Sequence, residues 1–99
     1  MVRRIIWARR AQEDRKSIFS YWNKRNKSKN YSKKLNSLFN QSIKLLSIYP
    51  QIGRTTNKEN IRIKVVRDYL IIYEFTDREL IILSIFDTRQ NQSKLKNIF

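Results

Sequence analysis

The sequence contains neither cysteine nor histidine. The absence of thiols excludes a disulfide framework, a thiolate nucleophile and a cysteine-ligated zinc site. The absence of imidazole removes the commonest general base and the commonest metal-ligating side chain. We therefore expect no metal and no cofactor, and a chemistry that depends on Lys, Arg, Tyr and a few carboxylates.

Glycine and proline are also scarce, with one of each, and both fall within Pro50–Gly53. A single glycine excludes a glycine-rich phosphate loop, and so few breakers indicate long elements on either side of one major break. No apolar run approaches the roughly 20 residues of a transmembrane helix. The first residues run straight into charge and do not resemble a signal peptide. We expect a cytoplasmic protein that does not bind membranes.

Acidic residues are few, with 8 Asp and Glu against 22 Lys and Arg, which gives a formal net charge of +14. Glu13 and Asp14 are neighbours on a predicted helix and point in different directions, so paired catalytic carboxylates are excluded. The 99 residues have room for one domain, residues 1–99. The 40% hydrophobic content is enough for a core, so the chain is not a disordered basic tail. The charge predicts a nucleic acid, a ribonucleoprotein or an acidic protein as partner.

The first half of the chain has the pattern of a strand followed by two helices. Val2–Trp7 is rich in strand-favouring residues. Apolar residues at helical spacing predict a helix from Ala8 to about Lys24 and a second helix from about Tyr31 to Tyr49, which Pro50 ends. The second helix carries an apolar stripe in steps of four and three residues, made of Tyr31, Leu35, Leu38, Ser42, Leu45 and Tyr49 and broadened by Phe39, Ile43 and Leu46. The short polar turn between the helices predicts an antiparallel hairpin.

The second half has the period of two that is typical of strands. After a loop over residues 51–60, the predicted strands are Ile61–Val65, Tyr69–Phe75 and Glu79–Asp87. On the first of these, Arg62 and Lys64 share a face, which we predict to be the exposed side of the sheet, away from the helices. Residues 88–99 are expected to form a short helix or an irregular arm.

The order of elements predicts an α+β fold. It consists of an N-terminal strand, an antiparallel helical hairpin and a three-stranded meander. The helices pack on one face of a mostly antiparallel four-stranded sheet, which satisfies both sets of apolar faces.

The chain resembles the RelE/ParE superfamily of toxins over residues 2 to about 92. The similarity lies in five strings that occur in the family's order and with its gaps: Ile6–Ala11, Pro50–Arg54, Ile61–Val66, Tyr69–Tyr73 and Ile82–Gln90. The resemblance implies the toxin of a type II toxin–antitoxin system, held inactive in a hetero-oligomer by an acidic antitoxin that is encoded beside it.

The family divides by target. RelE-like members cut messenger RNA on the ribosome, and this branch would make Arg62, Lys64 and Arg89 catalytic. However, Leu70 stands where that branch has a basic residue, and no Tyr or His follows Arg89. Leu70 and the Pro50–Arg54 string are more similar to ParE members, which poison DNA gyrase without cutting RNA. A non-toxic, basic nucleic-acid-binding module is a third hypothesis, supported only by charge.

Two sets of candidate binding residues follow from these hypotheses. The cations expected to contact gyrase, the ribosome with its messenger, or nucleic acid are Arg54, Arg62, Lys64, Arg67 and Arg89. The apolar residues expected to contact the antitoxin are Ile18, Trp22, Leu38 and Leu45.

Structural roles are open for several of the same residues. Arg62 and Lys64 could be solvated charges of an edge strand, and Arg89 could form a surface ion pair with Asp87. Gly53 is expected to adopt a positive φ, and Arg54 to pair with a carbonyl at the helix end. The expected core residues are Tyr69 and Tyr73, with hydroxyls at the rim, and Trp7 and Trp22.

Overall fold

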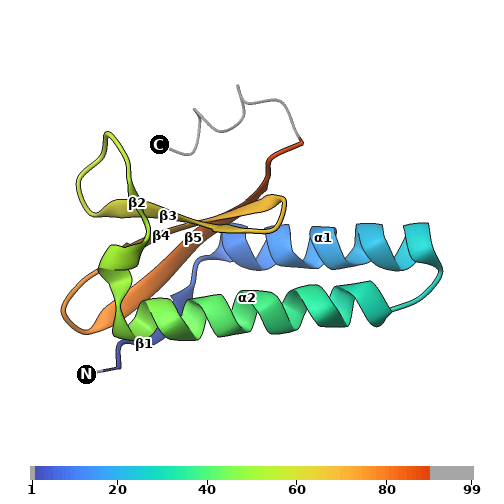
Figure 1. Ribbon diagram of the computed structural model, residues 1–99, viewed down its shortest axis with the longest axis horizontal. Coiled ribbons are helices and arrows are strands. Elements are labelled where there is room, and N and C mark those ends of the chain that lie inside the picture. The colour runs from blue at the N-terminus through green and yellow to red at the C-terminus, as the bar shows by residue number, and fades with distance from the viewer. Residues whose placement is uncertain (1, 90–99) are drawn as a thin grey trace.

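The computed structural model describes residues 2–89 of the chain (Figure 1). The elements are β1 (Arg4–Trp7), α1 (Arg9–Asn26), α2 (Asn30–Ile48), the 3-10 helix η1 (Pro50–Ile52), β2 (Arg54–Thr55), β3 (Ile61–Val66), β4 (Tyr69–Phe75) and β5 (Glu79–Asp87). Thr88 and Arg89 form a turn after β5. The rest of the expected C-terminal helix or arm, residues 90–99, lies outside the described residues.

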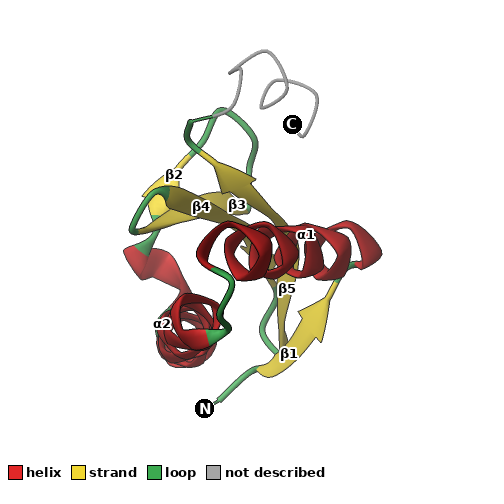
Figure 2. Cartoon of the chain, turned by 90° about the vertical axis from the view of Figure 1, so that its right-hand side faces the viewer, coloured by secondary structure: helices red, strands yellow, loops and turns green. Residues whose placement is uncertain are grey.

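The strands form one mixed sheet in the order β1-β5-β4-β3-β2, and only β1 and β5 run parallel. Both helices lie on the same side of this sheet (Figure 2). The predicted α+β fold is therefore confirmed. The sheet has one strand more than expected, because Arg54 and Thr55 pair with Ile63 and Arg62. Two residues are too short a segment to show a period of two.

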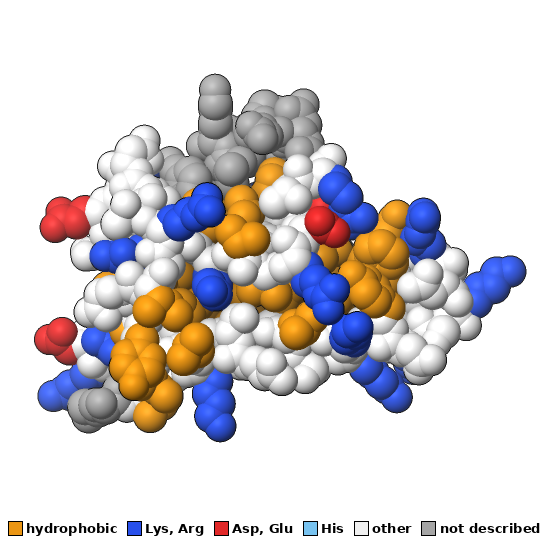
Figure 3. Space-filling model, in the orientation of Figure 1, with side chains coloured by type: hydrophobic (Ala, Val, Ile, Leu, Met, Phe, Trp, Pro, Cys, Tyr) orange, Lys and Arg blue, Asp and Glu red, His pale blue; other side chains and the backbone are white. Residues whose placement is uncertain are grey.

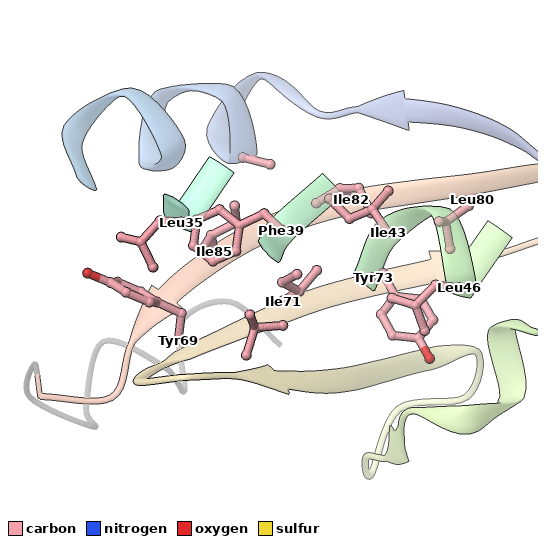
Figure 4. Close-up of a cluster of buried hydrophobic side chains, with 12 residues drawn as sticks. Leu35, Phe39, Ile43, Leu46, Tyr69, Ile71, Tyr73, Leu80, Ile82 and Ile85 are labelled. Atoms are coloured by element: carbon pink, nitrogen blue, oxygen red, sulfur yellow. The ribbon is translucent and has the colours of Figure 1, made fainter. Parts of the chain in front are cut away.

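The core lies between α2 and the central strands β4 and β5 (Figure 4). Its largest fully buried side chains include Phe39 of α2 and Tyr69 of β4, whose rings meet edge to face with centroids 5.6 Å apart. Tyr73 is also fully buried, at the other end of the cluster. Both tyrosines are core residues, as predicted. Trp7 and Trp22 are half-buried and pack against this core.

The buried stripe of α2 differs from the predicted stripe. Leu35, Phe39, Ile43 and Leu46 face the core, whereas Leu45 of the predicted stripe is 44% exposed. Phe39, Ile43 and Leu46 were predicted only to broaden the stripe. Each residue turns the helix by about 100°, so Leu38 and Leu45, one position before Phe39 and Leu46, point to one side of the core.

The predicted face of Arg62 and Lys64 is wrong. Arg62 lies opposite Tyr73 and Lys64 lies opposite Ile71 in the β3–β4 register. Directly opposed residues share a face of the sheet, and both partners belong to the core beneath the helices. Arg62 and Lys64 are thus on the helix-covered face, where both are half-buried. A period of two separates two faces but does not say which one the helices cover.

The face away from the helices is mainly apolar over β3 and β4, although it also carries Arg54, opposite Ile63, and Glu74, opposite Ile61. Across β3 and β4 it carries Ile63, which lies opposite the fully buried Ile72, and Val65, which lies opposite Leu70. The basic outer face that the sequence predicted is therefore replaced by aliphatic side chains, and the cations of β3 lie on the other side of the sheet.

Candidate functional site

The structure separates the predicted cations into two groups. Arg67 and Arg89 lie at the end of the sheet where β5 finishes, because the Thr88 N–H donates to the Asp68 carbonyl at 2.9 Å and joins the two turns. Arg54 and Arg62 lie at β2 and the neighbouring part of β3. Lys64 falls between the two groups, and these cations do not form one site.

Arg62 is engaged with the backbone of the segment that follows α2. Its Nη1 donates to the Gln51 carbonyl at 3.0 Å and to the Gly53 carbonyl at 2.9 Å. The prediction that Arg54 binds a carbonyl at the helix end is therefore wrong, since Arg62 binds the carbonyls of this segment. Arg54 is exposed on β2.

The Tyr73 hydroxyl, which comes from β4, binds the same segment. Its hydroxyl donates to the Pro50 carbonyl at 2.6 Å and accepts the Gly53 N–H at 3.1 Å. Burial raises the pKa of this hydroxyl above its ordinary value. The hydroxyl is buried between the two backbone groups and does not reach the rim as expected.

Gly53 is required for space and not for backbone conformation. Its φ is −71°, so the predicted positive φ is wrong. A Cβ at this position would overlap the Tyr73 hydroxyl and lie 2.9 Å from Tyr73 Cε1. Positive φ values occur instead at Lys27, Asn60 and Arg67.

Arg89 is held in one orientation by a carboxylate and two aromatic rings. Its Nε and Nη2 donate to the two Asp87 carboxylate oxygens at 2.9 and 2.8 Å, and its guanidinium carbon lies 5.3 Å from the centroid of the Trp22 ring. Trp22 Nε1 and Arg89 Nη2 both donate to the Tyr69 hydroxyl, at 2.7 and 3.3 Å. This arrangement favours an oriented recognition group over a loose surface pair.

The ion pair also sets the protonation of its members. Hydrogen bonds from Arg89 hold the pKa of the Asp87 carboxyl below its ordinary value, and the same contact raises the pKa of the Arg89 guanidinium. Burial raises the pKa of the Tyr69 hydroxyl. All three groups therefore keep their neutral-pH charge, which suits binding and provides no general base near neutral pH.

A cleft of about 400 Å³ opens beside Arg89, between α1 and the end of β5. Arg10, Asp14 and Tyr21 of α1 line it together with Tyr69 and Arg89. The Asp14 carboxylate is already bound, because its Oδ2 accepts the Ser84 hydroxyl at 2.7 Å and the Ile85 N–H at 3.1 Å. Arg10, Asp14 and Tyr21 were not among the site residues predicted from the sequence. The sequence showed only that these residues lie on the first helix. The fold places this part of α1 next to β5, and that contact is not evident from the sequence.

The three residues of the nuclease hypothesis do not converge. Arg62 lies opposite Tyr73, whereas Arg89 follows Asp87, which lies opposite Tyr69. The four steps from Tyr69 to Tyr73 along β4 span roughly 13 Å. Lys64 is two residues from Arg62 on β3. The Arg62 guanidinium binds the Gln51 and Gly53 carbonyls and the Arg89 guanidinium binds Asp87, so the structure does not gather the three groups around one phosphate.

The four residues predicted to bind the antitoxin lie on both helices. Ile18, Trp22 and Leu38 are half-buried against the core, and Leu45 is exposed. The Trp22 ring meets Tyr31 at the hairpin tip, with centroids 4.7 Å apart. Leu45 is 14 positions further along the same helix, or roughly 21 Å away.

Across residues 2–89, no group of three or more Asp or Glu side chains lies where it could hold a metal ion. The helices in that range are too short or too polar to cross a membrane.

Comparisons with known proteins agree with this geometry. A family model described as the ParE toxin of type II toxin-antitoxin system, parDE, matches residues 5–92. A solved structure described as the chromosomal ParDE TA system from P. aeruginosa superposes with a TM-score of 0.75 at 17% identity, covering 89% of this chain and 98% of that one. No curated protein matches the sequence significantly. The fold, its sheet order and the family match over residues 5–92 lead to one conclusion: the chain belongs to the ParE toxin family of type II toxin–antitoxin systems.

Proposed function

We propose that this toxin stops growth by poisoning DNA gyrase in the cytoplasm, and that an acidic antitoxin holds it inactive. Family membership supports the toxin and its antitoxin. The net charge of +14 favours an acidic partner, because complementary charge speeds association and lowers the self-repulsion of the toxin.

The position of Arg62 is the observation that favours gyrase over messenger RNA. Its guanidinium binds the Gln51 and Gly53 carbonyls and lies several residues along the sheet from Arg89. A ribosome-dependent nuclease needs its cations around one phosphate, where they stabilise the charge that develops as the RNA 2′-hydroxyl attacks. A toxin that binds gyrase needs no such convergence.

Within this proposal, Arg67 and Arg89 contact the target, with Arg54 and Lys64 as further cations. Arg67 and Arg89 are exposed at the same end of the sheet. Arg62 contributes by fixing the η1 segment. A non-toxic nucleic-acid-binding module rests on charge alone, and membership of a toxin family counts against it.

The test uses the purified toxin in two parallel assays. One measures gyrase-dependent cleavage of supercoiled DNA, and the other measures messenger cleavage on programmed ribosomes. We expect broken DNA and intact transcripts, and the opposite result would end the gyrase proposal. Arg89→Gln should reduce DNA cleavage, whereas Arg9→Gln, which removes an exposed cation from the outside of α1, should not.

A further inference from the structure

The turn that joins α1 to α2 carries a dense group of cations. It lies at one end of the molecule, beyond the end of the sheet (Figure 1). No Asp or Glu occurs between Asp14 and Glu59, and Figure 3 shows Lys and Arg side chains projecting from this end. Among residues 2–89, no cation of the turn takes part in an ion pair. We call the following six exposed residues the hairpin-tip patch: Lys24, Arg25, Lys27, Lys29, Lys33 and Lys34.

Contacts between the two helices hold the backbone beneath the patch. The Ser32 hydroxyl lies 3.0 Å from the Phe19 carbonyl oxygen and 2.6 Å from Asn23 Oδ1, within hydrogen-bond distance of both. The rings of Trp22 and Tyr31 pack edge to face across the same end of the hairpin. The cations therefore project from a fixed frame, unlike those of a disordered basic tail.

Lysine stands at positions of the turn where stability favours other residues. Lys27 ends α1 in the left-handed region, with a φ of 51°, where glycine or asparagine is the usual residue. The first turn of α2 contains no acidic residue to complement the helix dipole, and Lys33 and Lys34 follow it. The turn keeps its positive charge at a cost in stability, which is typical of a surface selected for function.

The composition of the turn favours a phosphate backbone over a protein partner. Five of the six cations are lysines, and lysine is depleted at protein interfaces. Residues 23–30 contain no hydrophobic side chain that could form the apolar centre of such an interface. Contacts to phosphate oxygens need only cations and hydrogen-bond donors, which the lysines, asparagines and serine of this segment supply.

The patch adjoins the candidate site at Arg89. The guanidinium carbon of Arg25 lies 5.9 Å from the centroid of the Trp22 ring, and that of Arg89 lies 5.3 Å from the same centroid. A long polyanion on the patch would therefore run beside a residue that we propose to contact the target. Duplex DNA, which gyrase holds, is such a polyanion, with one charge per roughly 1.7 Å of its axis.

We propose that the hairpin-tip patch binds the phosphate backbone of duplex DNA without sequence preference. The choice of DNA among polyanions rests on the proposed function. Binding at the patch holds the toxin next to the DNA that gyrase cleaves. The affinity comes from the release of counterions, so it falls as the salt concentration rises.

The experiment measures binding of the purified toxin to a short labelled DNA duplex by fluorescence anisotropy at several salt concentrations. The test variant is Lys24→Gln/Lys27→Gln/Lys29→Gln. We expect it to bind about tenfold more weakly than wild type at low salt. The slope of log affinity against log salt should become shallower by about 2 to 3, because each phosphate contact contributes about 0.9 to it.

The matched control is Lys16→Gln/Lys44→Gln/Lys58→Gln, which removes three exposed lysines from outside the patch. It changes the net charge as much as the test variant does. We expect its affinity to stay within about threefold of wild type and its salt slope to be unchanged. Thermal unfolding checks that each variant is folded.

Lys27→Gly asks whether the lysine at this position serves charge or fold. Glycine suits the left-handed backbone of residue 27, so the thermal midpoint should stay the same or rise. Binding to the duplex should weaken about twofold or more, because one phosphate contact is lost. A lower midpoint with unchanged DNA binding would show that Lys27 serves the fold, which contradicts the proposal.

The outcomes separate this inference from the proposed function. If wild type does not bind the duplex, or if test and control variants lose the same affinity, the patch is not a DNA site. Tighter binding of duplex RNA or of poly-glutamate than of DNA, with the same dependence on the patch, would also overturn it. If the patch binds DNA but the toxin produces no gyrase-dependent cleavage, only the proposed function fails.

Discussion

The Tyr73 hydroxyl donates a hydrogen bond to the Pro50 carbonyl, 23 residues earlier in the chain and 2.6 Å away. Together with the bond that it accepts from the Gly53 amide, it joins the middle of β4 to the segment that follows α2. The sheet and the C-terminal end of the helical hairpin are thereby locked to each other by one side chain.

Tyr73→Phe should lower the free energy of unfolding by about 1–3 kcal/mol, because it leaves two buried backbone groups without a partner. Urea unfolding followed by circular dichroism measures the change. Tyr49→Phe is the control, since Tyr49 is 56% exposed and should change stability by less than about 0.5 kcal/mol. Equal stability of the two variants would show that the buried hydroxyl contributes nothing.

Gly53→Ala should destabilise the protein by about 1–3 kcal/mol, because the new Cβ overlaps the Tyr73 hydroxyl. The cost should shrink in a Tyr73→Phe background, where the hydroxyl is gone, and a double-mutant cycle measures this coupling. A cost that is the same in both backgrounds would mean that the ring carbons of residue 73, which phenylalanine keeps 2.9 Å from the new Cβ, and not the hydroxyl, require glycine at position 53.

Arg62→Met should lower stability by about 1–2 kcal/mol, because the Gln51 and Gly53 carbonyls lose their shared donor. Lys64→Met is the comparison, since Lys64 is half-buried on the same face of β3 and no hydrogen bond of its side chain is found within residues 2–89. Chemical denaturation of both variants tests the difference. A larger loss from Lys64→Met would contradict the structural role of Arg62.

The Asp87–Arg89 pair predicts a loss of stability in acid. Because the folded state lowers the pKa of the Asp87 carboxyl, the pair stabilises the protein above the ordinary carboxyl pKa of about 4. That contribution disappears as the pH falls through the lowered pKa. Urea unfolding between pH 2 and 7 should show a steeper decline below pH 4 for wild type than for Asp87→Asn. If the free energy of unfolding falls equally steeply with pH in both proteins, Asp87 does not contribute to the loss of stability in acid.

Much of the fold was predictable from the sequence, because long amphipathic periods and one Pro–Gly break fix where the elements lie. The α2 helix and the three strands of the meander follow from those patterns within a few residues. The end of α2 was predictable for the same reason, since Pro50 cannot continue the helix.

The features that the sequence did not predict depend on contacts between residues that are far apart in the chain. Nothing local in Arg62 distinguishes the face under the helices from the opposite face, and nothing beside Gly53 indicates that Tyr73 would fill the space of its side chain. Leu45 belongs to an apolar stripe in the sequence, yet it lies about 100° around α2 from the buried Leu46 and is 44% exposed.

The parallel pairing of β1 with β5 has a consequence for how the toxin is made. Arg4 aligns with Glu79, so β1 can join the sheet only after β5, the last described strand, has been synthesised. Contacts this far apart in the chain close late and slowly. A nascent toxin that has not yet released β5 from the ribosome therefore lacks the strand that holds β1 and β4 together. A chain that ends before Glu79 cannot form this sheet, because β1 and β4 both pair with β5.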